Sequence, residues 1–124
     1  MSRPPPGHSK PAVAIYASGH GFGPATRMAA LLERLEPALG ADFDLHVRSD
    51  APSWLFHETT AGTPVHRVAP DPGVLQRNAL DVDLEATIRA HERFADSWER
   101  CLSQEAELLQ RMAPAVVVSD IPPL

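Results

Sequence analysis

The chain contains 124 residues, 44% of them hydrophobic and 22% charged, and it carries a formal net charge of −5. This size and composition are typical of one soluble globular domain that can bury a core, and the lack of a basic block argues against nucleic acid as a partner. The single cysteine, Cys101, excludes an internal disulfide, and no apolar run approaches the roughly 18 residues that a membrane-spanning helix needs. We therefore expect a cytoplasmic protein with no transmembrane segment.

The first third of the sequence predicts a tail, a strand and a helix. Residues 1–10 are rich in proline and are expected to be a disordered tail, which leaves residues 11–124 for the domain. Residues 11–18, PAVAIYAS, are short, apolar and partly β-branched, which indicates a buried strand. From Pro24 the apolar residues recur at helical spacing up to Gly40, and Pro37 is expected to kink or end this helix.

The rest of the chain continues the alternation of strands and helices. The patterns predict, in order, a half-buried strand over residues 43–48, a short helix over 53–57, a weaker strand over 63–68, a loop over 70–83, a long helix over 84–112 and an apolar strand over 115–119. Asp81 or Asp83 is expected to cap the long helix, whose apolar stripe, including its Trp and Phe, is interpreted as core.

Such an order predicts an α/β fold, a Rossmann-like parallel sheet with helices on both faces. Right-handed crossovers place the second and third strands successively outward from the first. In a doubly wound sheet the fourth strand then lands on the other side of the first, and a crevice opens above the carboxyl ends of these two strands.

Two segments that are far apart in the sequence would meet at that crevice. The first strand is followed by a loop with three glycines and one histidine, His20, and the fourth strand is followed by Asp120. The glycines allow a tight turn and the close approach of a ligand, while a histidine oriented by an aspartate can remove a proton from a hydroxyl. We interpret His20 and Asp120 as a candidate catalytic pair.

Simpler interpretations stay open for each of these residues. His20 can be a solvated loop histidine, and Asp120 can cap a following helix. Arg27, near the start of its helix, either pairs with a carboxylate or holds an anionic group. The acidic residues 81, 83 and 85 lack the glycine and the terminal glutamate of a calcium loop, so helix capping is favoured and no metal site is predicted.

The segment YASGHGFGPATR resembles the opening of a family of glycosyltransferase-like proteins whose motif reads Gly-His-Gly-Phe-Gly-His-Ala-x-Arg. The same segment is found in the N-terminal, glycosyltransferase-like half of plant-type L-arabinokinases and in related bacterial proteins. The likeness continues in DPGVLQRNALDVDLEAT and in VVVSDIPPL, so that it covers nearly the whole chain from about residue 12.

This resemblance implies a GT-B fold, in which two Rossmann-like domains face a cleft and the N-terminal domain binds the acceptor. In such enzymes acting on small acceptors, a histidine after the first strand is the general base, and an aspartate after a later strand supports it. His20 and Asp120 match these positions. The resemblance therefore implies inverting transfer from a nucleotide sugar to a small-molecule or glycan acceptor, with no metal or other cofactor.

On the same interpretation, further residues line the donor-phosphate or acceptor side of the cleft, and two in the long loop contact the acceptor. The first set is Gly19, Gly21, Phe22, Gly23 and Arg27, and the second is Gln76 and Asn78.

The sequence also departs from the family pattern. Pro24 stands where the family has a second histidine. A GT-B enzyme needs roughly 300 residues for its two domains, so we expect this chain to be a truncated acceptor-side domain that is inactive alone. Its apolar sheet edge would then be exposed and promote self-association.

Two rival functions remain. The chain can be a non-catalytic glycosyltransferase-like module that binds a sugar or nucleotide, linked to a sugar kinase. It can also be a dinucleotide-binding domain with Asp50 near a ribose, although Gly-x-Gly-x-Gly replaces the expected Gly-x-Gly-x-x-Gly and an imidazole stands where pyrophosphate would approach.

Overall fold

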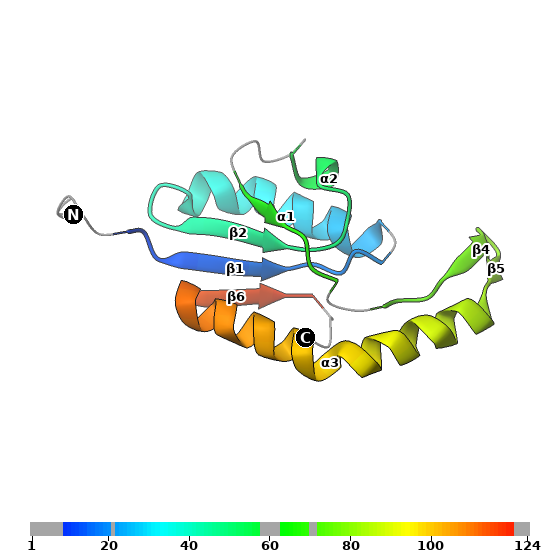
Figure 1. Ribbon diagram of the computed structural model, residues 1–124. Helices are drawn as coiled ribbons and strands as arrows, with labels where there is room; N and C mark the ends of the chain where they lie inside the picture. The colour runs from blue at the N-terminus through cyan, green and yellow to red at the C-terminus, as the bar shows by residue number, and fades with distance from the viewer. Residues whose placement is uncertain (1–8, 21, 58–62, 70–71, 121–124) are drawn as a thin grey trace.

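The computed structural model describes residues 9–20, 22–57, 63–69 and 72–120 (Figure 1). They form an α/β structure with a four-stranded sheet in the order β3-β2-β1-β6, in which every paired strand is parallel. The four strands are β1 (Ala12–Tyr16), β2 (Asp44–Arg48), β3 (Val65–His66) and β6 (Val116–Ser119). The predicted strand order is confirmed, with the last strand on the other side of β1 from β2 and β3.

β1 lies at the centre of the sheet, and all five of its residues are buried. Ile15 pairs with Val47 on one side and with Val118 on the other. Side chains alternate between the two faces of a strand. Accordingly Val13 and Ile15 belong to the main apolar core, while Tyr16 contacts the helix on the opposite face.

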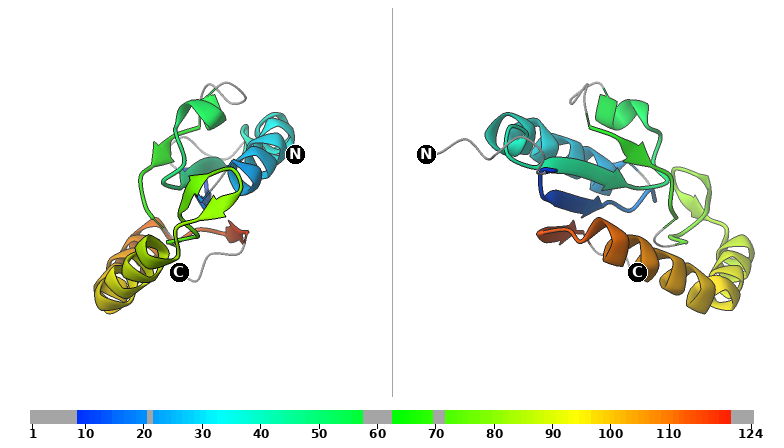
Figure 2. Two further views of the ribbon diagram at one scale, coloured as in Figure 1. Left: turned by 90° about the vertical axis from the view of Figure 1, so that its right-hand side faces the viewer. Right: turned by 60° about the vertical axis from the view of Figure 1, so that its left-hand side comes forward.

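α1 (Gly23–Leu39) and the short α2 (Trp54–His57) lie on one face of the sheet and the long α3 (Leu84–Met112) on the other, as Figure 2 shows. α1 buries Ala25, Met28, Ala29 and Leu32 in the core that it shares with β1 and β2. Its first turn contains Pro24, as predicted, and it continues through Pro37. Of the two expectations for Pro37, an end of the helix at this residue is wrong, because Pro37 lies inside the last turn. Gly40 closes the helix as predicted, donating to the Glu36 carbonyl at 2.8 Å.

α3 (Leu84–Met112) is the long helix, and it lies on the opposite face. Asp83 caps it as predicted, accepting a hydrogen bond from Ala86 N at 2.9 Å. The apolar stripe is not the continuous core that we expected, because the N-terminal half of the helix extends beyond the sheet (Figure 1) and leaves Leu84 and Ile88 exposed. Among the helix residues, the buried one is Glu105.

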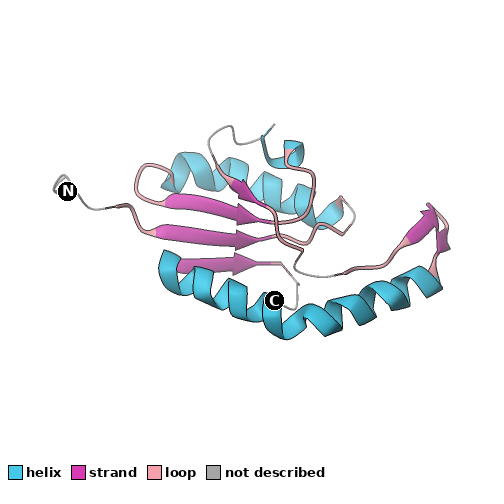
Figure 3. Cartoon of the chain, in the orientation of Figure 1, coloured by secondary structure: helices cyan, strands magenta, loops and turns pink. Residues whose placement is uncertain are grey.

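The segment predicted as a loop over residues 70–83 contains a small antiparallel hairpin. Its strands are β4 (Gln76–Asn78) and β5 (Asp81–Val82). Asn78 Oδ1 accepts from Leu80 N at 2.9 Å and so closes the turn. The pattern missed this hairpin because its three- and two-residue strands are too short to show a period. A colour-coded view by secondary structure (Figure 3) shows it at the start of α3.

The free side of β6 is exposed. β6 pairs with β1 alone among the described strands, and Val116 and Val117 are 52% and 50% exposed. Self-association through this edge stays a prediction, and a monomeric sample that unfolds cooperatively would contradict it. In the part of the chain that the structure describes, no helix combines the length and apolar character needed to cross a membrane.

Candidate functional site

The carboxyl ends of β1 and β6 meet at Ser18, as the predicted winding of the sheet requires. Asp120 Oδ2 accepts a hydrogen bond from Ser18 N at 3.0 Å, although 102 positions separate them. Asp120 N also donates to the Tyr16 carbonyl at 3.3 Å. On the other side, Ser18 Oγ accepts from His20 N at 3.3 Å. Ser18 therefore lies between the Asp120 carboxylate and the backbone amide of His20, and neither of these bonds involves the imidazole.

The imidazole of His20 accepts a hydrogen bond from a third segment, residues 73–74. Its Nε2 accepts a hydrogen bond from Val74 N at 3.0 Å. A ring nitrogen that accepts an amide hydrogen carries no proton, so Nε2 acts as an acceptor in this arrangement. The adjoining Gly73 carbonyl lies 2.8 Å from His91 Nε2 of α3, which attaches this segment to the helix.

Gly73 allows the backbone to come close to the imidazole. Its φ is +62°, and an added Cβ would overlap the Cγ and Nδ1 of His20. We expect Gly73→Ala to move residues 73–74 away from His20 and to cost about 1–3 kcal/mol of local stability. Hydrogen exchange of the Val74 amide should become faster. The matched control is Gly23→Ala, since a Cβ at Gly23 has no atom within 4 Å; unchanged Val74 exchange in Gly73→Ala would contradict the assignment.

A second carboxylate lies beside the candidate pair. Asp50 follows β2, and its Oδ1 would overlap a Cβ built on Gly19, whose Cβ would also lie 2.6 Å from Ala51 N. Gly19 is thus required for the close approach of the loops after β1 and β2. Because Asp50 and Asp120 flank the end of β1, the site is acidic and suits the hydroxyl groups of a neutral ligand better than phosphate.

The other predicted site residues within the described part of the chain lie at the start of α1 and in the hairpin. Phe22 and Arg27 are exposed at the start of α1, and Gly23 is its first residue. Gly21 lies outside the described residues. Gln76 and Asn78 belong to the hairpin, which Figures 1 and 2 place at the far end of α3, away from the ends of β1 and β6.

Sequence reasoning missed a buried polar cluster behind the site. Arg48 Nε donates to Glu105 Oε2 at 2.7 Å and Arg48 Nη2 donates to Oε1 at 2.5 Å, while Tyr16 Oη donates to Oε2 at 2.6 Å. Burial opposes ionisation of Glu105, but the bonds from Arg48 and Tyr16 outweigh it and lower the pKa of this carboxyl. Burial and the neighbouring carboxylate raise the pKa of Tyr16 to about 12. No local pattern in the sequence could have joined residues so far apart.

The same face of the sheet carries a pair of histidines. His46 Nδ1 lies 3.4 Å from His66 Nε2, and their rings are stacked with centroids 5.6 Å apart. Burial, with the neighbouring charge of Arg48, lowers the pKa of His66. No group of three or more His, Cys, Asp or Glu side chains that could hold a metal ion is present in the described ranges.

One cavity lies away from the candidate site. It measures about 180 Å³ and lies between the end of α1 and the start of β2, with Glu36, Phe43 and Thr63 among its lining residues. That end is opposite to the end where Ser18 and Asp120 meet. Its volume is below the roughly 300 Å³ at which small-molecule pockets begin, so it adds nothing to the site.

Comparison with known proteins gives one informative likeness. The chain is 32% identical over 114 residues to an L-arabinokinase of Arabidopsis thaliana, which is 90% of this chain and 11% of that protein. No protein-family model matches the sequence, and no solved structure matches it. The similarity therefore covers most of this chain but only a short part of the other protein, whose name includes a sugar.

Proposed function

We propose that the chain binds a sugar hydroxyl at the carboxyl edge of β1 and β6, as the acceptor-binding part of a glycosyltransferase. The observation that supports the proposal is the position of the Asp120 carboxylate, which accepts from Ser18 N at 3.0 Å and so lies at the loop that carries His20. The similarity to part of an L-arabinokinase supports a sugar as the ligand. The acidic surroundings support a neutral polyol in preference to a phosphate.

In the proposed reaction His20 is the general base. The acceptor hydroxyl gives its proton to the imidazole, and its oxygen attacks the anomeric carbon of a nucleotide sugar. The bond from that carbon to the diphosphate breaks, and the leaving nucleoside diphosphate keeps the electron pair. Asp120 supports the imidazolium electrostatically. Because Nε2 accepts from Val74 N, the acceptor hydroxyl must replace this amide before transfer.

Binding is tested first on the 124-residue chain. A panel of free aldoses that includes L-arabinose, and a panel of nucleotide sugars, are titrated while amide and imidazole resonances are followed by NMR. An aldose is expected to shift the resonances of Ser18, His20 and Asp120. His46→Gln is the matched control, because His46 lies in β2 on the face that carries Arg48. If no aldose moves these resonances, the proposal fails.

Catalysis is tested by turnover. In any protein that contains this domain and releases nucleoside diphosphate from a nucleotide sugar, His20→Ala should lower turnover by about 10²-fold or more. Unchanged turnover would remove His20 from the mechanism.

A second function is favoured by the name of the relative, because a kinase transfers a phosphoryl group rather than a sugar. The chain would then be a non-catalytic sugar-binding module associated with a sugar kinase. This alternative predicts the same aldose binding, no release of nucleoside diphosphate from any nucleotide sugar, and normal behaviour of His20→Ala in kinase turnover.

A further inference from the structure

Two aromatic side chains form an exposed corner beside the candidate site. Phe22 lies just before α1, and Trp54 is the first residue of α2 (Trp54–His57). Their ring centroids are 6.4 Å apart and their planes are inclined by 47°. Phe22 is 62% exposed and Trp54 is 52% exposed. Single exposed aromatics are common, but here two of them contact each other and both stay more than half exposed.

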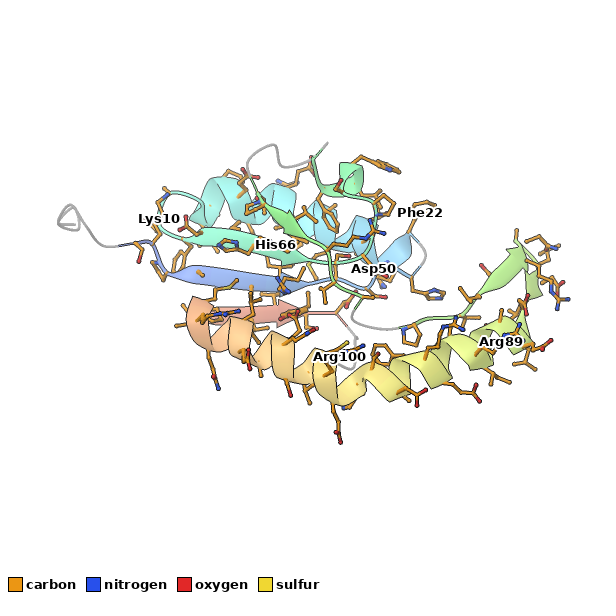
Figure 4. The ribbon with its side chains drawn as sticks, viewed as in Figure 1. Lys10, Phe22, Asp50, His66, Arg89 and Arg100 are labelled. Atoms are coloured by element: carbon orange, nitrogen blue, oxygen red, sulfur yellow. The ribbon has the colours of Figure 1, made fainter. Side chains whose placement is uncertain are left out.

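The position of this aromatic corner links it to the polar groups of the site. Phe22 follows His20 by two residues, and Trp54 follows Asp50 by four. The loops that carry these residues are held together where Asp50 closes on Gly19. Figure 4 shows Phe22 and Asp50 at the same end of the sheet, beyond the strands. The Asp50 carboxylate and the exposed Phe22 therefore lie at the same end of the sheet.

The geometry decides which ligand suits such a surface. A flat nucleobase stacks best between nearly parallel rings, whereas these two rings are inclined by 47°. A sugar ring is puckered, with C–H bonds on one face and hydroxyls around its rim. Polarised C–H groups are attracted to the negative face of an aromatic ring, while the rim hydroxyls can donate to carboxylates.

We propose that Phe22 and Trp54 form a stacking platform for the C–H face of the sugar whose hydroxyl is bound at His20. The inference rests on the proposed function and makes it more specific, because it assigns Trp54 as a specificity-determining residue for a neutral saccharide ring. The platform selects ligands by the apolar face of the ring, and the edge formed by Ser18 and Asp120 orients the hydroxyls.

The chain contains two tryptophans, Trp54 and Trp98, so replacing Trp98 leaves Trp54 as the single source of tryptophan fluorescence. In a Trp98→Phe background, tryptophan fluorescence reports Trp54 alone. Because Trp98 lies on α3, the same variant is also the matched aromatic control. Free aldoses, methyl glycosides and uridine monophosphate are titrated separately. An aldose or methyl glycoside is expected to change the fluorescence of Trp54 in a saturable manner, and uridine monophosphate is not.

Affinity is then measured by NMR for Trp54→Ala, Phe22→Ala and the conservative Trp54→Tyr. The alanine variants should bind the sugar about tenfold more weakly, and Trp54→Tyr should retain most of the affinity. Both residues are exposed, so unchanged circular dichroism is expected and verifies that each variant is folded.

The outcomes separate the two proposals. If the sugar shifts Ser18, His20 and Asp120 but binds Trp54→Ala as tightly as the parent chain, the platform is wrong and the proposed function stands. The platform is also wrong if uridine monophosphate alone changes Trp54 fluorescence. If no sugar binds the parent chain, both proposals are lost.

Discussion

Replacing Glu105 with leucine is expected to lower the free energy of unfolding by about 3–5 kcal/mol. The substitution leaves the guanidinium of Arg48 buried without the carboxylate that now accepts two of its hydrogen bonds, and both side chains are about one-tenth exposed. It also removes the acceptor of the Tyr16 hydroxyl. Urea unfolding followed by circular dichroism measures the change.

Two control variants distinguish the cost of burying Arg48 without its partner carboxylate from any general effect of placing leucine in α3. Glu107→Leu changes an exposed glutamate two residues further along α3 and should alter stability by no more than about 0.5 kcal/mol. The double variant Arg48→Met with Glu105→Leu should recover most of the loss, because apolar residues of similar size can replace a buried ion pair. A single variant as stable as the parent would show that α3 is not held to the sheet by this contact.

Raising the pH is expected to destabilise the chain through Tyr16. The folded-state pKa of this phenol is about 12, above its ordinary value of 10. A group with a raised folded-state pKa stabilises the fold fully below its unfolded pKa, and this contribution is lost as the pH rises through the folded pKa. About 2 kcal/mol should therefore disappear between pH 10 and 12. Because Tyr16 is the only tyrosine of the chain, tyrosinate absorbance reports it directly.

Variants of the same cluster test this result. Tyr16→Phe should remove the loss of stability in this pH range, and Glu105→Gln should return the pKa of Tyr16 toward 10, because an amide no longer repels the phenolate. If the parent chain titrates near pH 10 while still folded, the hydroxyl of Tyr16 does not bond to Glu105 in solution.

Much of the fold could be predicted because its signals are local. β1 is apolar throughout and is followed by the glycine-rich loop from Gly19, which identifies a buried central strand, and the helical spacing after Pro24 identifies α1. The alternation of elements, together with right-handed crossovers, was enough to bring Asp120 to the loop that contains His20. The contact of Asp120 with Ser18 follows from that topology, whereas the bond from His20 N to Ser18 Oγ is local.

The features that could not be predicted depend on contacts between distant residues. In the sequence Arg48 and Glu105 are ordinary charged residues 57 positions apart, and they are buried because folding brings their side chains together. The sequence predicts only that Trp54 belongs to a short helix, and its pairing with Phe22 arises when the loops after β1 and β2 meet. The exposed half of α3 has the same apolar periodicity as a buried helix, so periodicity alone could not reveal that it extends beyond the sheet.

If His20 binds an acceptor hydroxyl as proposed, the hydrogen bond from Val74 N competes with that hydroxyl. An incoming hydroxyl needs the lone pair that the Val74 amide already occupies. The apparent affinity for that hydroxyl is therefore the intrinsic affinity multiplied by the fraction of molecules in which the imidazole has been released. Since the Gly73 carbonyl is bonded to His91, a change at the solvent-exposed start of α3 would alter saccharide binding without any contact to the saccharide.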